Sequence, residues 1–320
     1  MDYQWYPGHM TKARRMMEDN IRLVDLVIEL LDARIPVSSR NPDINTLAKG
    51  KERLIILAKA DLADPDITDQ YLKYYQGHGL TAVAVDARTR KFNSEVQKAV
   101  QRATAAKRER DLRRGIRNRP VRAMICGIPN VGKSTFINSL SGKSGAKTGN
   151  KPGVTRGRQW ISCAGMDLLD TPGILWPKFE DQQVGIRLAL TGAIRDDILD
   201  AQELSCCLIS ILVARYPGLL GERYAVNETR LAKRPLNTAG NHADISQKDS
   251  AAAAKIAYNE AGCAAVLEEI AFRRNLLGPH GMADTRRAAN MLLDDYRSGR
   301  IGRITLDEFD ENYTVFTEST

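Results

Sequence analysis

Five runs of continuous hydrophobic residues recur along the first part of the chain, and each of them ends in a polar cluster. The runs lie at 23–34, 53–61, 80–87, 121–127 and 166–173. Continuous rather than alternating hydrophobicity is typical of parallel strands whose two faces are both covered. Helical stretches intervene at 92–114 and 134–142. The alternation predicts an α/β fold with a doubly wound, mostly parallel sheet, in which ligands bind at the carboxyl ends of the strands.

The hydrophobic pattern changes near residue 179. Before that point, the segment 156–165 predicts an antiparallel edge strand, joined to the next hydrophobic run by a tight turn at Ala164-Gly165. After it, helical periodicity and alanine dominate. A chain of 320 residues is also long for a single core. We therefore expect two domains, an α/β domain over 1–178 and a mostly helical domain over 179–320.

The charge of the chain bears on its partners. Its formal net charge is +8 and its pI is near 9.2, which favours an acidic partner such as RNA or DNA, although a merely basic protein has the same composition. The segment 102–119 carries eight Lys or Arg and two acids, which fits either a solvated helix face or a contact with phosphates. Further arginines suited to a phosphate footprint are Arg14, Arg15, Arg273, Arg274, Arg286, Arg287, Arg297, Arg300 and Arg303.

The cysteines and the apolar segments indicate the cellular compartment of the protein. The five cysteines form no Cys-x-x-Cys pair, which is typical of reduced thiols in a cytosolic protein. The N-terminal sequence has no apolar region of a secretory signal, and the best apolar run, 206–214, is too short for a bilayer. We expect a cytoplasmic protein without a membrane span.

The sequence CGIPNVGKSTFINSL at 126–140 contains the phosphate-loop pattern Gly127-x4-Gly132-Lys133-Ser134, between a predicted strand and a predicted helix. Glycines in such a loop let backbone N–H groups point inward to hold phosphates at the helix N-terminus. We expect Lys133 to reach the β- and γ-phosphates and the Ser134 hydroxyl to ligate Mg²⁺. The predicted phosphate-binding residues of this loop are Asn130, Val131, Gly132, Lys133, Ser134 and Thr135.

A second element of nucleotide chemistry follows the phosphate loop. Asp170-Thr171-Pro172-Gly173 ends a buried run, where Asp170 is placed to hold Mg²⁺ through water and the Gly173 N–H to contact the γ-phosphate. The intervening segment 144–157 is rich in Gly, Lys and Thr and is predicted to be a mobile loop. In that loop Thr155 is the predicted third Mg²⁺ ligand, and Thr148 is a weaker candidate for the same role.

A guanine-nucleotide domain normally carries an Asn-Lys-x-Asp loop after its phosphate loop, and this chain has none there. Two upstream runs instead end in Ala58-Lys59-Ala60-Asp61 and in Asp86-Ala87-Arg88. We expect Asp61 to accept from guanine N1 and N2, the Lys59 stem to cover the base, and the Ala87 N–H to meet O6. If these runs lie beside the phosphate-loop strand, the domain is circularly permuted. The predicted guanine-binding residues are Ala58, Lys59, Asp61, Asp86 and Ala87.

The order of these elements resembles that of the YlqF-type circularly permuted GTPases. Three further stretches match one branch of them, ribosome biogenesis GTPase A: QWYPGHMTKARR (4–15), DARIPVSSRNP (32–42) and RSGRIGRITLDEF (297–309). The resemblance implies GTP hydrolysis coupled to late maturation of the large ribosomal subunit, as a release or checkpoint step. It implies GTP and GDP as ligands, the large-subunit precursor and its rRNA as partners, and a helical RNA-contacting C-terminal domain. We expect a monomer away from the ribosome.

The chain departs from related patterns at two positions. Ala58 stands where the family has Asn, and the loss of one neutral hydrogen bond costs about 1 kcal/mol, so guanine preference should survive with weaker affinity. Ile174 stands where Ras-like enzymes carry the Gln that orients water. The family-matched candidate for the missing catalytic group is His9, for which a structural or RNA-contacting role is the alternative. Asn130 matches the residue that helps to hold K⁺ in potassium-activated relatives; an ordinary loop role is the alternative.

Two other functions use the same loop. An ATP-dependent P-loop kinase is disfavoured by the Lys-Ala-Asp and Asp-Thr-Pro-Gly elements. A nucleotide-gated RNA-binding module with negligible turnover fits Ala58 and the missing Gln. The sequence favours a GTPase with Mg²⁺, and K⁺ is a candidate for a second cation.

Overall fold

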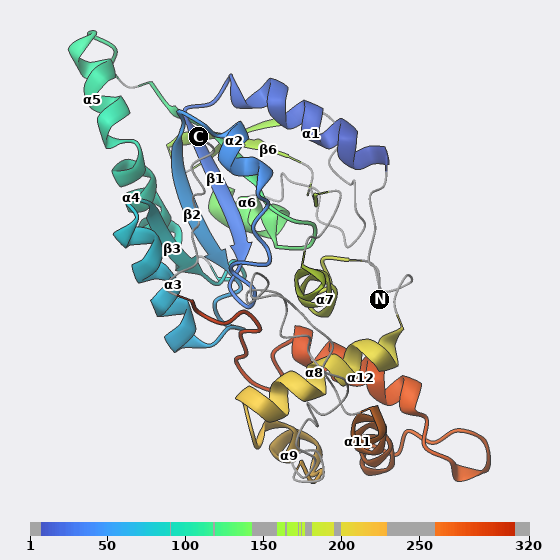
Figure 1. Ribbon diagram of the computed structural model, residues 1–320. Helices are drawn as coiled ribbons and strands as arrows, with labels where there is room; N and C mark the ends of the chain where they lie inside the picture. Colours follow the sequence, from blue (N-terminus) through green and yellow to red (C-terminus); the bar gives the residue numbers. More distant parts are fainter. Residues whose placement is uncertain are drawn as a thin grey trace, which may run out of the picture. The chain divides into compact units, whose positions relative to one another are not determined.

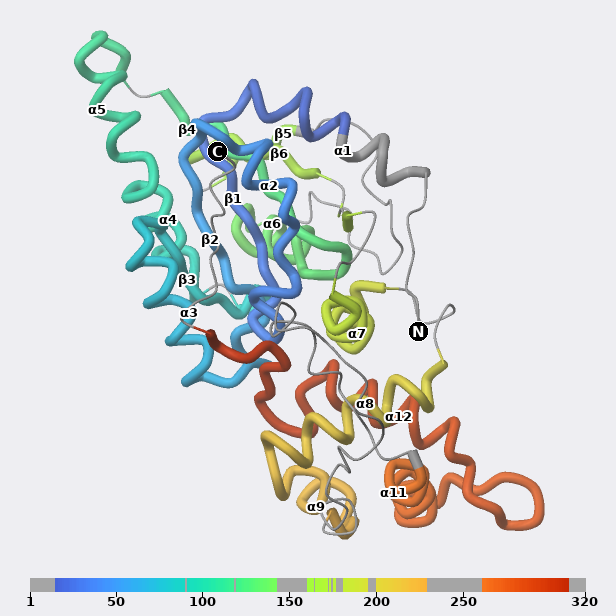
Figure 2. The backbone as a smooth tube through the Cα atoms, viewed as in Figure 1, coloured from blue at the N-terminus to red at the C-terminus, as the bar shows by residue number. Residues whose placement is uncertain are grey.

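The computed structural model describes residues 8–89, 91–117, 119–142, 159–163, 165–171, 173, 175–176, 181–194, 200–228 and 260–310. The chain divides into two compact units, with boundaries at Phe179/Glu180 and at Ile304/Thr305. The sequence-based expectation places all of 179–320 in a second domain, whereas residues 305–310 pack with the first unit. Figure 2 traces the chain through both units by residue number.

The first unit contains a six-stranded sheet in the order β3-β2-β1-β4-β6-β5 (Figure 1). All pairs are parallel except β5, which runs antiparallel to β6 at the sheet edge. The predicted doubly wound, mostly parallel sheet is therefore confirmed, and so is its antiparallel edge strand. The strands are β1 (Leu26–Asp32), β2 (Glu52–Ala58), β3 (Thr81–Val85), β4 (Val121–Cys126), β5 (Gln159–Cys163) and β6 (Met166–Asp170).

This strand order explains how distant segments meet. β4, the strand that leads into the phosphate loop, pairs with β1 on one side and with β6 on the other. β1 pairs with β2 from Leu26↔Glu52 to Asp32↔Ala58, and β2 pairs with β3. Because these strands are parallel, their carboxyl ends lie at one edge of the sheet, and the loops that follow β1, β2, β3, β4 and β6 gather there.

Helices cover both faces of the sheet. Val27 packs against α1 and α2, and Leu31, four residues on and thus on the same face, packs against α3. On the opposite face lie α4 and α6, which the stacked rings of Phe92 and Phe136 join at a centroid distance of 5.4 Å. The helices are α1 (Gly8–Ile21), α2 (Asp43–Leu47), α3 (Pro65–Gly77), α4 (Asn93–Ala103), α5 (Ala105–Arg113) and α6 (Lys133–Ser141).

The helix predicted over 92–114 is in fact two helices that meet at Thr104. This residue is buried, and its hydroxyl donates to the backbone carbonyl of Val100 at 2.7 Å. Such a bond competes with the backbone pattern of a continuing helix and ends α4 there. The break separates α4, which packs on the sheet, from α5, which buries none of its residues and extends beyond the sheet (Figure 1).

The second unit is helical in its described residues, as the periodicity predicts. α8 is buried on most of its surface and contacts α7, α9, α11 and α12. The buried Asp295 carboxylate accepts from Arg223 at 2.8 Å and from the Tyr224 hydroxyl at 2.9 Å, which joins α9 to α12. No helix in the described ranges is long and apolar enough to cross a membrane. The helices are α7 (Gln182–Leu190), α8 (Ala201–Arg215), α9 (Leu219–Tyr224), α11 (Glu260–Arg273) and α12 (Thr285–Arg297), with a short 3₁₀ turn, η2 (Pro279–Gly281).

Candidate functional site

The phosphate loop runs from the end of β4 into α6, in the context that the sequence predicts. Asn130 and Gly132 both have positive φ, 56° and 107°, and Gly132 is the N-cap of α6. Gly127 begins the loop where a Cβ atom would lie 2.5 Å from the backbone oxygen of Leu30, so a side chain does not fit. Val131 is buried and anchors the loop. Left-handed turns at a helix N-terminus direct backbone N–H groups into one concavity, which suits a phosphate.

Lys133 lies under this loop. Its ammonium donates to the backbone carbonyls of Gly127 at 3.0 Å and Ile128 at 2.8 Å. Burial lowers the pKa of Lys133 to about 8, against the opposing effect of the Asp170 carboxylate. The loop therefore fixes a cation at the place where phosphate-loop lysines meet the β- and γ-phosphates. Ser134 and Thr135 follow it in the first turn of α6.

The end of β6 meets the phosphate loop from the other side. Asp170 is buried and is the register partner of Ile125 on β4. The Thr171 hydroxyl donates to the Ile125 backbone carbonyl at 2.6 Å and ties the two segments together. Gly173 passes so close to the loop that a Cβ atom there would lie 2.8 Å from the backbone of Pro129. The segment 170–173 is thus in direct contact with the phosphate loop and its strand.

The upstream segment that is predicted to read the base also contacts the phosphate loop. The Lys59 ammonium donates to the backbone carbonyl of Asn130 at 2.8 Å, across 71 residues of sequence. Ala58 is buried at the end of β2, and Lys59 has a φ of 59°, which turns the chain out of the strand. The Ser139 hydroxyl on α6 donates to the Ala87 backbone carbonyl at 2.6 Å. Both predicted base-reading segments therefore lie beside the phosphate loop and its helix.

Asp61 and Asp86 lie near one another at the mouth of this region. The Arg88 guanidinium pairs with the Asp61 carboxylate and with the Asp86 carboxylate. Burial and the neighbouring Asp86 raise the pKa of Asp61, while Arg88 opposes that shift. The Asp61 carboxylate thus accepts from an N–H donor of this chain, and guanine N1 and N2 also present N–H donors, so the reading of guanine by Asp61 stays a prediction.

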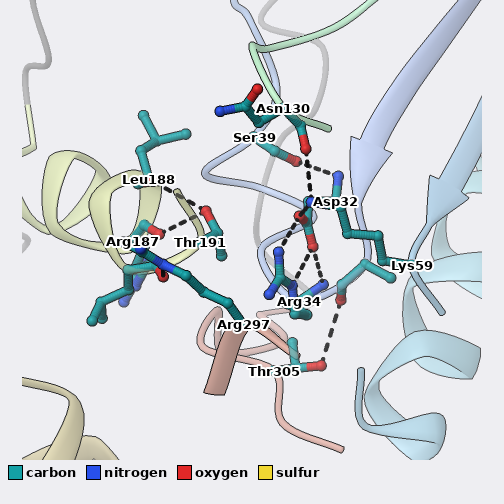
Figure 3. Close-up of polar contacts among 12 residues, drawn as sticks. Asp32, Arg34, Ser39, Lys59, Asn130, Arg187, Leu188, Thr191, Arg297 and Thr305 are labelled. Carbon is teal, nitrogen blue, oxygen red and sulfur yellow. Dashed lines mark hydrogen bonds and ion pairs between the residues drawn. The ribbon is translucent and has the colours of Figure 1, made fainter. Parts of the chain in front are cut away.

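A buried ionic cluster that sequence reasoning did not assign lies behind Lys59 (Figure 3). The Asp32 carboxylate, 1% exposed, accepts from the Arg34 guanidinium at 2.9 and 2.7 Å and from the Lys59 ammonium at 2.9 Å. The Asp32 N–H donates to the Ser39 hydroxyl at 3.0 Å. Burial alone raises the pKa of Asp32, but the ion pairs with Arg34 and Lys59 overcome it and hold this pKa well below its usual range. The cluster orients Lys59 towards the phosphate loop.

The sequence carried a signal for this cluster. Asp32 ends a buried run, and polar residues at the carboxyl ends of parallel strands gather at the ligand edge. Some of the predicted residues lie outside the described residues: Thr148, Thr155, Ile174 and the side chain of His9, whose backbone belongs to α1.

Together, the strand order and the phosphate loop define a P-loop GTPase domain that is circularly permuted, because β1, β2 and β3 precede β4 in the chain but extend the sheet beside it. Residues 122–231 match the family of 50S ribosome-binding GTPases, starting in β4. The chain is similar to ribosome biogenesis GTPase A of Priestia megaterium, with 41% identity over 96% of this chain and 97% of that protein. The Bacillus cereus protein of the same name is also 41% identical, over 97% of this chain and 95% of its own length.

A solved structure of GNP-bound YlqF from T. maritima shares the fold, with a TM-score of 0.55, 23% identity, and coverage of 93% of this chain and 98% of that one. The chain belongs to the ribosome biogenesis GTPase A family, and it is a GTPase. This confirms the resemblance seen in the sequence.

The Asp32 cluster generates a stability prediction. Asp32→Asn leaves Arg34 and Lys59 without their buried counter-charge and should lower the free energy of unfolding by about 3–5 kcal/mol. Asp25→Asn is the matched control, because that carboxylate lies on the same unit in a more exposed pair with Lys107 at 3.5 Å, and it should cost less than about 1 kcal/mol. Urea unfolding at pH 7 measures both changes, and equal costs would contradict the account.

The same cluster predicts a pH dependence. The pKa of Asp32 is lower in the folded than in the unfolded chain, so its stabilisation is present above the ordinary value of 3.8 and is lost as the pH falls below it. The stability difference between wild type and Asp32→Asn should therefore narrow on acidification below that value. If the difference in unfolding free energy stays constant with pH, the stabilisation does not come from an ionised Asp32 carboxylate.

Proposed function

We propose that this GTPase reads guanine through its upstream loops, binds rRNA of a large-subunit precursor, and uses GTP hydrolysis as a release or checkpoint step in late maturation. The observation that carries the proposal is the Lys59 ammonium, which touches the phosphate loop while its own segment ends in Asp61. A nucleotide carries a base as well as phosphates, so one nucleotide could contact both segments. The names of the relatives, ribosome biogenesis GTPase A and 50S ribosome-binding GTPase, support the partner.

The residues at the phosphate loop fit Mg²⁺. Within the described ranges no group of three His, Cys, Asp or Glu side chains forms a metal site. Mg²⁺ in nucleotide enzymes needs no such cage, because it takes one or two protein oxygens together with phosphates and water. The Ser134 hydroxyl at the start of α6 and the Asp170 carboxylate at the end of β6 would supply such oxygens, and Thr155 would add a third. When bound, Mg²⁺ would neutralise charge on the β- and γ-phosphates.

Potassium is the proposed second cation. Asn130 stands at the turn of the phosphate loop with a φ of 56° and an exposed side chain, next to the place of the phosphates. A K⁺ held there would supply positive charge during hydrolysis, in the role that an arginine plays in other GTPases.

Catalysis by this chain needs a group in place of the absent Gln. Ile174 has no polar atom with which to orient water. His9 is the proposed residue, because an imidazole can position or deprotonate water near neutral pH. It lies at the start of α1, and we propose that docking on the ribosomal subunit brings it to the γ-phosphate.

The basic helix α5 is the proposed contact with rRNA. A nine-residue helix without a buried residue gains little from packing. Its two acids are each paired within the helix, Lys107 with Asp111 and Arg113 with Glu109, both at 2.6 Å. The remaining charge is an excess of exposed arginines, which complements the phosphates of RNA. These arginines are Arg108 and Arg110 in the helix and Arg114, Arg117 and Arg119 beyond it; Arg110 also pairs with Glu52 at 3.5 Å and Arg119 with Asp25 at 3.8 Å.

Base recognition supplies the first test. Asp61→Asn should weaken GTP binding and strengthen binding of xanthosine triphosphate by roughly 10- to 100-fold each, because an amide donor complements the xanthine carbonyl and charged hydrogen bonds are worth about 1.5–3 kcal/mol. Ala58→Asn should tighten GTP binding by about fivefold, by restoring the contact of the family. Fluorescence titration of both variants measures these affinities. Unchanged selectivity in Asp61→Asn would place base reading elsewhere.

Subunit-dependent turnover supplies the second test. The isolated protein should hydrolyse GTP slowly, and large subunits should accelerate it, more in K⁺ than in Na⁺. High salt should abolish the stimulation by screening phosphate contacts. His9→Ala should lose the stimulated rate while keeping GTP affinity and subunit binding. Single-turnover hydrolysis separates these outcomes: negligible turnover on subunits would favour the nucleotide-gated RNA module, and full stimulation of His9→Ala would return that residue to a structural role.

A docking variant distinguishes binding from catalysis in the same assay. The double change Arg108→Glu and Arg114→Glu should weaken subunit binding and reduce its salt dependence, since each arginine removed is one phosphate contact fewer. The GTP affinity of the free protein should be unaltered, because Arg108 and Arg114 are both exposed. Subunit affinity equal to that of the wild type would remove α5 from the interface.

A further inference from the structure

The last described residues of the chain form a buried strap on the first unit, which we define as residues 305–309. It belongs to the stretch RSGRIGRITLDEF, for which neither the fold nor the proposed reaction gives a role. The strap forms no helix or strand, yet Thr305, Leu306 and Asp307 are buried. Burial of an irregular segment requires that its polar groups find specific partners. Those partners point to what the strap does.

Asp307 makes the densest set of contacts. Its carboxylate accepts from the Val37 N–H at 2.7 Å, from the Ser38 N–H at 2.8 Å and from the Ser38 hydroxyl at 2.6 Å, across 269 residues of sequence. Hydrogen bonds to an ionised acceptor in a buried setting are among the strong ones. The loop that they fix is the one that follows β1, and its next residue, Ser39, accepts from the Asp32 N–H.

A first route leads from the strap to Lys59. The Leu306 N–H donates to the backbone carbonyl of Arg34 at 2.7 Å. The guanidinium of Arg34 holds the Asp32 carboxylate, and Asp32 in turn holds the ammonium of Lys59. The strap therefore fixes the backbone of a residue whose side chain positions the base-reading lysine.

A second route reaches the other end of the base-reading loop. The Thr305 hydroxyl accepts from the Asp64 N–H at 3.0 Å, three residues after Asp61. Asp64 is also the N-cap of α3, where its carboxylate accepts from the Asp66 N–H at 2.9 Å. The Phe309 ring packs edge-on against Tyr71 of α3 at 5.2 Å, and the Tyr71 hydroxyl donates to the Glu308 carbonyl at 2.9 Å. The strap thus contacts the loop 59–64 directly at Asp64, and it is linked to Lys59 through Arg34 and Asp32.

We propose that the strap positions the base-reading loop and that Asp307 is a positioning residue for guanine selectivity. This rests on the proposed role of Asp61 in reading the base. A carboxylate that accepts from N1 and N2 together must be correctly placed and oriented, and a loop released at one end loses that placement before it loses the phosphates. Loss of Asp307 should therefore act on base selectivity and leave the preference between GTP and GDP unchanged.

The measurement is the ratio of the dissociation constants for inosine and guanosine triphosphates, because inosine lacks the N2 amino group that Asp61 is proposed to bind. Asp307→Ala should weaken GTP binding by roughly five- to tenfold and shift this ratio towards one, within the usual range of coupling between sites. Asp307→Asn keeps acceptors for the two backbone N–H groups and should lie between Asp307→Ala and the wild type. The ratio of the dissociation constants for GTP and GDP should stay at its wild-type value.

Asp295→Ala is the matched control, since that carboxylate is equally buried and accepts from Arg223 and Tyr224 in the second unit. It should lower stability without changing the inosine-to-guanosine ratio. If Asp307→Ala does not fold, Thr305→Val removes the acceptor of the Asp64 N–H with little change of shape and should lower selectivity in the same direction. If the folded strap variants keep the wild-type ratio of inosine to guanosine triphosphate dissociation constants, the proposal is overturned.

The predicted switch of Asp61→Asn to xanthosine triphosphate distinguishes a failure of the strap proposal from a failure of the Asp61 assignment. If that switch occurs and the strap variants keep wild-type selectivity, the strap has no part in base reading while Asp61 keeps its role. If the switch does not occur, the assignment of Asp61 is wrong, and the positioning role of the strap is lost with it.

Discussion

The ammonium of Lys59 lies between the Asp32 carboxylate on one side and the carbonyl of Asn130 on the other. Through it, a residue that lies 71 positions before Asn130 in the sequence contacts the phosphate loop. The contact exists because Asp32 is buried and charged, and because Arg34 shares the charge. A buried carboxylate without those partners would be strongly destabilising, so the three side chains stabilise the site only as a set.

The sheet explains why a permuted order of elements leaves the site intact. Hydrogen bonds between neighbouring strands, and not the sequence of the chain, decide which loops meet. β4 lies between β1 and β6, so the carboxyl ends of β1, at Asp32, and of β6, at Asp170, flank the phosphate loop. Permutation moves the chain ends and creates a new connection, which here includes α5. A connection that need not pack on the sheet is available for a partner, and its excess of arginine fits RNA.

The sequence predicted what depends on local pattern. Continuous hydrophobic runs identified the strands, and glycine spacing identified the phosphate loop between β4 and α6. The break at Thr104 was missed because it depends on one side-chain hydrogen bond inside a stretch of helical periodicity. The roles of Asp32 and Asp307 were missed for a different reason. Their partners lie on other elements, in the case of Asp307 across 269 residues, and no periodicity reports such a contact.

The central claim is that one nucleotide contacts the phosphate loop, which follows β4, and also the loops after β2 and β3, which precede β4 in the sequence. Hydrogen exchange of backbone amides tests it most directly, with GDP and inorganic pyrophosphate compared in the presence of Mg²⁺. The account predicts that both ligands slow exchange at 127–135, and that GDP alone also slows exchange at 58–64 and 86–89. Protection by GDP that is confined to 127–135 would contradict it, because the base would then be bound by some other part of the chain.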